Sequence, residues 1–155
     1  MKNAARSWMR SSRGAPSMAD DVILAKAEII ERCLQRVQDS LRRRCCEAAD
    51  RFHGQDSILL NLERACQAAI DLALHLVRVR RLGLPKESRE AFELLEQAGL
   101  LPSEMAASLR AMVGFRNVAV HNYRDLDLEV VRSIVETKML VLKEFSRKSL
   151  QDFHS

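Results

Sequence analysis

Residues 20–41 read DDVILAKAEIIERCLQRVQDSL, and their apolar side chains recur at alternating steps of four and three positions. These apolar positions are Ile23, Ala27, Ile30, Leu34, Val37 and Leu41. Such steps return a side chain to the same face of an α-helix, which turns once in about 3.6 residues. The stretch therefore predicts one long amphipathic helix with a narrow apolar seam, and Asp20 is its expected N-cap.

A second stretch repeats this spacing after a break near Gly54. Its apolar positions are Ile58, Leu62, Ala65, Ala69, Leu72, Leu76 and Val79. We expect Asp56 or Ser57 to cap this second helix, and Gly83 and Pro85 to end it. Narrow seams of this kind suit burial within one helical bundle, and they suit a dimer interface equally well.

Two further helices follow the long pair. A short helix is expected to open at Ser88 and to close at Gly99, because serine caps helix starts and glycine favours helix ends. Another runs from about Glu104 toward Phe115, and the pattern leaves open whether it continues past Gly114.

Length and composition predict a single all-α domain. The chain has 155 residues, of which 47% are hydrophobic, and it holds only five Gly and three Pro. A last helix is expected from about Asp127, with a frayed tail at 149–155. Residues 1–17 are interpreted as a disordered or mis-started extension. The predicted fold is an up-and-down bundle of about five helices within residues 18–148.

The net charge of +4 does not by itself support nucleic-acid binding, because of where the charge lies. Residues 1–17 carry four basic side chains and no acid, so the remaining residues hold 25 − 4 = 21 basic against 21 acidic side chains. Arginines at 42–44 and at 78–81 could still form a basic face. Solvated helix faces are the commoner explanation for such runs.

The cysteines predict neither a zinc site nor a disulfide framework. Cys33, Cys45, Cys46 and Cys66 lack the CxxC and Cys/His spacings of metal sites, and no secretory signal precedes them. We expect reduced thiols in a cytoplasmic protein without a metal or a cofactor. No apolar run approaches the roughly 18 residues that a membrane span needs.

The stretch RNVAVHNY, residues 116–123, is the candidate site. A histidine can move protons near neutral pH, and an arginine can stabilise charge that builds up on a phosphate. Metal-independent RNA cleavage needs both functions. Arg116 and His121 would lie about 140° apart on an unbroken helix. The helix must therefore end or bend between them, or a second subunit must complete the site.

This stretch resembles the R-x4-H-x-Y signature of the HepT-like toxins, a family of the HEPN ribonuclease superfamily. Arg116, His121 and Tyr123 occupy the signature positions. The resemblance also takes in Gln67–His75 and the run from Met112, and it covers roughly residues 20–145. Pro85, Phe92, Leu95 and Gly99 contribute to it as well.

The resemblance implies a toxin of a type VII-like toxin–antitoxin system. Arg116 and His121 would be the catalytic pair of a metal-independent endoribonuclease, active on RNA as a homodimer whose two motifs face one cleft. Asn117 would orient the pair and Asp71 would shape the cleft, although a buried aspartate hydrogen-bonded within the bundle is an equally good interpretation. The cognate antitoxin, a minimal nucleotidyltransferase (MNT), would add AMP to Tyr123 and so neutralise Arg116.

Two other classes of function fit the residues. The chain would be a non-catalytic subunit of a nucleotidyltransferase complex if Arg116 only held a phosphate of a bound substrate or nucleotide. It would be a plain helical dimerisation module if the motif were an ordinary helix-ending turn.

Overall fold

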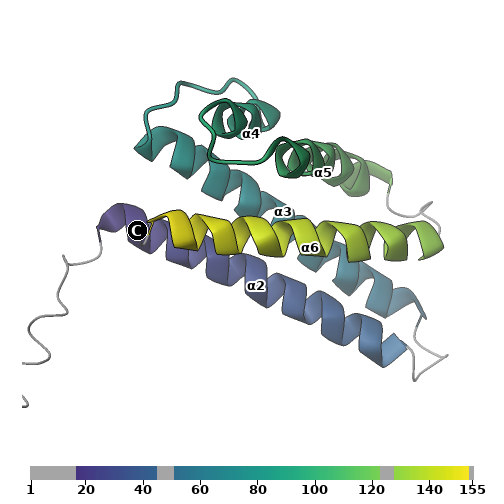
Figure 1. The fold of residues 1–155 in the computed structure, drawn as a ribbon. Coiled ribbons are helices and arrows are strands. Elements are labelled where there is room, and N and C mark those ends of the chain that lie inside the picture. The colour runs from purple at the N-terminus through teal and green to yellow at the C-terminus, as the bar shows by residue number, and fades with distance from the viewer. Residues whose placement is uncertain (1–16, 45–50, 123–127, 154–155) are drawn as a thin grey trace, which may run out of the picture.

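The described residues fold into helices that run up and down along one another (Figure 1). The computed structural model describes residues 17–44, 51–122 and 128–153, and this part of the chain contains no strand. The helices are α2 (Met18–Arg44), α3 (Arg51–Val79), α4 (Ser88–Gln97), α5 (Ser103–Asn122) and α6 (Leu128–Phe153). The predicted all-α bundle is confirmed.

The two long seams pack against each other and form the centre of the bundle. Ile30 and Val37 of α2 and Leu62 and Leu72 of α3 are completely buried. Burial of a side chain of this size stabilises the fold by about 1.5–3 kcal/mol. Val79 is an exception among the predicted seam positions, because it is the last residue of α3 and is 38% exposed.

The start of α2 differs from the prediction by three residues. Ser17 Oγ accepts a hydrogen bond from the backbone N–H of Asp20 at 3.4 Å, and Asp20 Oδ2 accepts one from the N–H of Ser17 at 3.0 Å. This reciprocal pair is a capping box. Ser17 is therefore the N-cap, and Asp20 acts from the third helical position.

The boundaries of α3 also correct the sequence prediction. The helix begins at Arg51 and runs through Gly54, where a break was expected. It ends at Val79, ahead of the predicted stop at Gly83, because Arg81 takes a left-handed conformation with φ of 54°. The N–H of Leu82 then reaches back to the carbonyl of Val77 at 3.0 Å, as in a Schellman motif.

The short helix α4 begins at Ser88 as predicted and packs on α3 and α5. Its N-cap is Glu87 and not Ser88, and Glu87 makes no side-chain capping hydrogen bond. Gly99 follows it with φ of +74°, a conformation in which glycine carries no side-chain penalty. The ring of Phe92 meets the ring of Phe145 of α6 edge to face, with centroids 5.8 Å apart. Arg110 Nη1 of α5 lies 2.6 Å from Glu96 Oε2 of α4. Aromatic packing and an ion pair therefore hold α4 in place.

The last two helices are longer than the pattern predicted. α5 continues past Gly114 to Asn122, and α6 continues past Lys148, where a frayed tail was expected, to Phe153. Ser149 is buried, and its hydroxyl donates to the carbonyl of Phe145 at 2.8 Å. Lys148 Nζ lies 3.3 Å from Asp152 Oδ2. These contacts account for the ordered final turns. Asp127 lies outside the described residues.

Candidate functional site

The predicted site lies on the last part of α5, which forms a continuous helix from Ser103 to Asn122. The helix does not end between Arg116 and His121. At about 100° per residue, these two positions are therefore separated by about 140° around the axis. The sequence allowed a helix end between Arg116 and His121, and this arrangement is therefore excluded. Only the backbone of position 121 is described, and Tyr123 lies outside the described residues.

Arg116 is half-buried, and its Nε atom is fully buried. This Nε–H finds no hydrogen-bond acceptor among the described residues. A buried donor without an acceptor is costly, and functional sites are one place where proteins retain such groups. A guanidinium suits an anion in such a site, because its fork of N–H groups matches the oxygens of a phosphate.

The neighbours of Arg116 come from two other helices. Burial raises the pKa of the Cys66 thiol of α3 to about 12, and the cations of Lys138 and Arg116 oppose that rise. Lys138 of α6 and Arg116 of α5 therefore both act on the same buried thiol. The packing of three helices thus brings two cationic side chains into one neighbourhood. No local pattern links Lys138 to Arg116, because the two residues are more than twenty positions apart.

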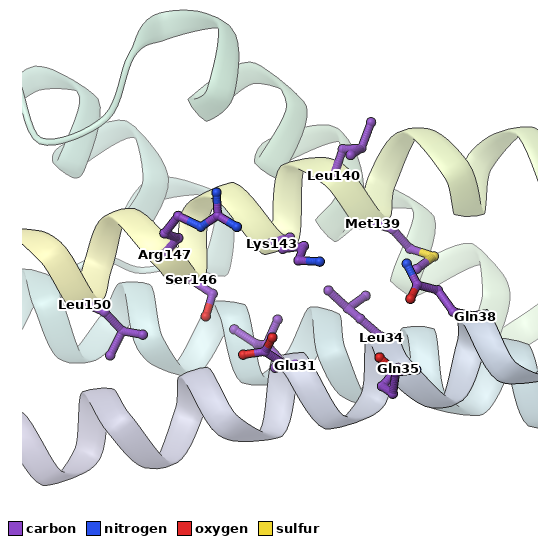
Figure 2. A pocket seen from close by; sticks show the side chains of 11 residues that line it. Glu31, Leu34, Gln35, Gln38, Met139, Leu140, Lys143, Ser146, Arg147 and Leu150 are labelled. Atoms are coloured by element: carbon purple, nitrogen blue, oxygen red, sulfur yellow. The ribbon is translucent and has the colours of Figure 1, made fainter.

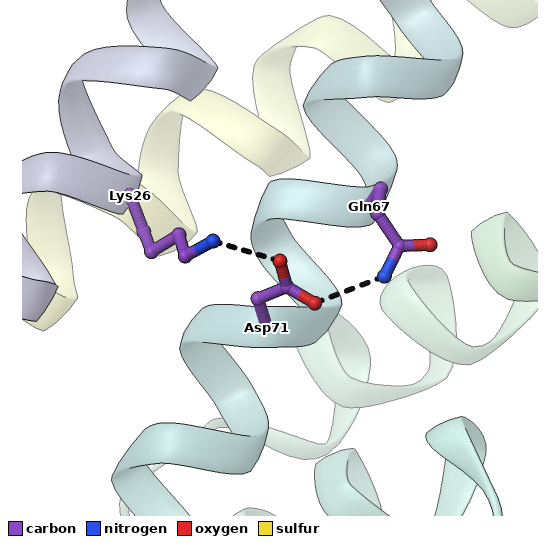
Figure 3. Close-up of polar contacts among 3 residues, drawn as sticks. All are labelled: Lys26, Gln67 and Asp71. Carbon is purple, nitrogen blue, oxygen red and sulfur yellow. Dashed lines mark hydrogen bonds and ion pairs between the residues drawn. The ribbon is translucent and has the colours of Figure 1, made fainter.

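Asp71 lies at the seam between α3 and α2 (Figure 3). Its Oδ2 is 2.8 Å from Lys26 Nζ of α2, and its Oδ1 accepts a hydrogen bond from Gln67 Nε2 at 2.9 Å. The carboxylate side chain is 35% exposed. These contacts tie Asp71 to α2. They do not include Arg116, and Asp71 lies five residues, about 140°, from Cys66 around α3.

Asn117 is exposed on the surface of α5. It follows Arg116 directly and lies about 100° away around the helix. The guanidinium of Arg89 lies beside Gly114, three positions earlier on the same helix. The two residues mark a polar, accessible face of α5 that differs from the half-buried face of Arg116.

A groove of about 230 Å³ lies between α2 and α6 (Figure 2). Ile30, Leu34 and Met139 supply its apolar lining, and Glu31 and Lys143 contribute charges. No predicted site residue lines this groove, so it is a feature separate from the Arg116 neighbourhood.

Two further properties concern the described part of the chain alone. None of its helices is both long and apolar enough to cross a membrane. It also holds no group of three or more His, Cys, Asp or Glu side chains arranged to bind a metal ion.

An up-and-down bundle with an arginine-led polar motif at the end of one helix places the chain in the class of HEPN-like all-α domains. The chain belongs to the HepT-like ribonuclease family, whose model matches residues 30–149. Membership of this family confirms the predicted enzyme class, an endoribonuclease.

Known relatives agree with this assignment. The chain is 39% identical over 126 residues to the mRNA nuclease HepT of Shewanella oneidensis, a match that covers 81% of this chain and 94% of that protein. It is 33% identical over 91 residues to a putative RNase of Archaeoglobus fulgidus, over 58% of this chain and 68% of that one.

Solved structures extend the similarity to the fold. A tri-AMPylated HEPN toxin of Shewanella oneidensis, in complex with its MNT antitoxin, superposes with a TM-score of 0.75 at 38% identity, covering 83% of this chain and 96% of that one. A toxin–antitoxin structure with AMP-PNP gives a TM-score of 0.75 at 37% identity, over 83% and 98% of the two chains.

Proposed function

We propose that this protein is the toxin of a type VII-like toxin–antitoxin pair and cleaves RNA without a metal ion, with Arg116 and His121 as the catalytic pair. The observation that carries the proposal is the half-buried Arg116, whose Nε–H has no acceptor among the described residues, in a member of a ribonuclease family. Two relatives bear names that refer to RNA cleavage, and the solved relatives include a toxin bound to an MNT antitoxin.

The chemistry divides between the two residues. His121 takes a proton from the 2′-hydroxyl of the RNA, so that this oxygen attacks the adjacent phosphorus and the bond to the 5′-oxygen breaks. A second histidine returns a proton to the departing 5′-oxygen. Arg116 binds the phosphate oxygens as negative charge accumulates on them. Asn117, on the exposed face of α5, holds the substrate or the histidine in position, and Asp71 contributes through the α2–α3 packing.

A homodimer supplies the second histidine and the missing geometry. Because α5 is unbroken through both positions, one chain presents Arg116 and His121 from faces about 140° apart. Two chains related by a twofold axis can place the arginine of one beside the histidine of the other. The active unit is therefore a pair of chains whose motifs face one cleft.

Tyr123 is the expected point of control. An MNT antitoxin transfers AMP to its phenol oxygen, which attacks the α-phosphorus of ATP and releases pyrophosphate. The attached phosphate carries negative charge into the cleft and competes with RNA for Arg116. The tri-AMPylated relative is the precedent for this regulation.

Cleavage of RNA by purified protein in excess EDTA tests the proposal. Arg116→Ala is expected to lower kcat by about 10²–10³-fold, as for removal of one donor to a transition-state oxyanion. His121→Ala is expected to abolish cleavage. Arg36→Ala, an exposed arginine of α2, is the matched control and should cleave like the wild type. Wild-type activity that disappears with EDTA, or persists in His121→Ala, would refute the mechanism.

A mixing experiment tests the composite site separately. Wild-type and His121→Ala chains are unfolded together in several ratios, refolded and assayed. If the cleft needs the histidines of both chains, mixed dimers are inactive, and cleavage falls with the square of the wild-type fraction. Cleavage that falls only in proportion to the wild-type fraction would show that each chain carries its own complete site.

A further inference from the structure

Gly114 has an unusual neighbour for a glycine inside a helix. Glycine is less favourable than alanine in a helix interior, so its presence in the middle of α5 needs a packing reason. A Cβ atom at this position would lie 2.8 Å from Arg89 Nη2 and 3.9 Å from Arg89 Cζ. The guanidinium of Arg89 thus occupies the space that a side chain at 114 would fill, and it lies directly against α5.

The positive charge of Arg89 is unfavourable at its position in α4. It stands in the first turn of α4, where the helix dipole disfavours a cation. The residue is exposed, and no carboxylate in the described ranges lies within ion-pairing distance of it. Arg110, one turn before Gly114 on α5, is instead paired with Glu96 at 2.6 Å. The charge of Arg89 is therefore open to a ligand from solution.

Arg89 lies against the same face of α5 that carries two positions of the candidate site. Residues 114, 117 and 121 of α5 follow one another at steps of three and four, so they share one face of the helix. From 114 to 121 the helix advances about 10 Å. A single strand that contacts both Arg89 and position 121 must therefore offer backbone groups about 10 Å apart.

We propose that Arg89 is a second phosphate-binding residue of the RNA site, contacting the backbone about 10 Å from the bond that is cleaved. A planar guanidinium held on Gly114 suits a phosphate, because it offers two parallel N–H groups to two oxygens. The inference rests on the proposed ribonuclease function and extends it: the substrate is a single strand several nucleotides long, laid along the 114–117–121 face of α5.

Binding of single-stranded RNA oligonucleotides tests the proposal. Affinity is measured in a His121→Ala background, so that RNA stays intact, with a 12-nucleotide strand at several salt concentrations. Arg89→Ala is expected to weaken binding about three- to tenfold. It should also reduce the steepness of log K against log salt by about 0.7, the contribution of one phosphate in single-stranded RNA.

Two further variants separate the contact from a loss of structure. Gly114→Ala keeps the charge of Arg89 but forces its guanidinium to move, so binding should weaken while the helix becomes no less stable. Arg36→Ala removes the same charge from α2, which does not contact α4 or α5 in the described part of the chain. This control should leave the affinity and the salt slope unchanged.

The outcomes are distinct. If the wild type cleaves RNA and Arg89→Ala matches Arg36→Ala in affinity and salt slope, the Arg89 contact is refuted and the proposed function stands. If Arg89→Ala weakens only the binding of a nucleotidyltransferase partner, the residue belongs to a protein interface and the RNA contact is again refuted. If the wild type neither binds nor cleaves RNA, both proposals fail.

Discussion

Arg81→Gly should stabilise the protein, because Arg81 is held with φ of 54° at the end of α3. The left-handed conformation costs a residue with a side chain about 1–2 kcal/mol. Glycine avoids this cost but loses about 0.5–1 kcal/mol through its greater freedom in the unfolded chain. The expected net gain in the free energy of unfolding is about 0.5–1 kcal/mol, or roughly 1–4 °C in Tm for a chain of this length.

Urea unfolding followed by circular dichroism measures this gain. Arg78→Gly is the matched control: Arg78 is exposed in the last turn of α3, within the helix, so glycine there should lower the free energy of unfolding by about 0.5–1 kcal/mol. The two variants should therefore shift the midpoint in opposite directions. A lower midpoint for Arg81→Gly would show that contacts of the arginine side chain outweigh the backbone strain, and the reasoning would be wrong.

Three further outcomes can be measured on the folded chain. A double-mutant cycle with Phe92→Leu and Phe145→Leu should give a coupling of about 0.5–1.5 kcal/mol for the edge-to-face pair, and additive losses would count against it. Hydrogen bonds from Arg110 and Ser103 lower the pKa of Glu96 in the folded protein. The ionised Glu96 side chain therefore stabilises the fold fully above its unfolded pKa of about 4.3, and this stabilisation is lost as pH falls through the lower pKa of the folded state. Glu96→Gln should therefore flatten the acid limb of stability against pH in urea titrations. Burial raises the pKa of Cys66 to about 12, so iodoacetamide should label it at least about a hundredfold more slowly in native than in unfolded protein, as followed by mass spectrometry of its peptide.

The helical seams were predictable because burial follows the helical period. The side chains of Ile23, Ile30 and Val37 are all buried, as the four-three spacing required. The helix ends were less predictable. A glycine in a helix interior costs about 1 kcal/mol, yet α3 runs through Gly54 and α5 through Gly114.

The stop of α3 at Arg81 has no sequence signal, because a left-handed arginine depends on the tertiary contacts of the following residues. Leu82, directly after it, packs against the core and so fixes the turn. The start of α2 carried a signal that was assigned to the wrong residue. Ser17 and Asp20 fit the spacing of a capping box, in which Ser17 and not Asp20 is the N-cap.

The candidate site was likewise predictable where it depends on neighbouring residues in the sequence, and not where it depends on contacts between different helices. The motif from Arg116 is a local feature and is visible in the sequence, as is its placement near the end of a helix. The neighbours of Arg116 come from α3 and α6, and no local pattern links Cys66 or Lys138 to it. The same holds for Arg89, whose contact with Gly114 joins α4 to α5.

The arrangement of the chain ends bears on how the protein can be handled. His75 Nε2 lies 3.1 Å from the carbonyl oxygen of Ala19, and Arg80 Nη2 donates to the carbonyl of Asp152 at 3.5 Å, so the start of α2 and the end of α6 meet at the closing end of α3 (Figure 1). Cys66, whose thiol senses the charge of Arg116, lies nine residues before His75, about 14 Å along the axis. A tether attached beyond Phe153 therefore emerges away from Arg116. Immobilisation beyond Phe153 is therefore expected to leave the proposed RNA-binding face of α5 accessible.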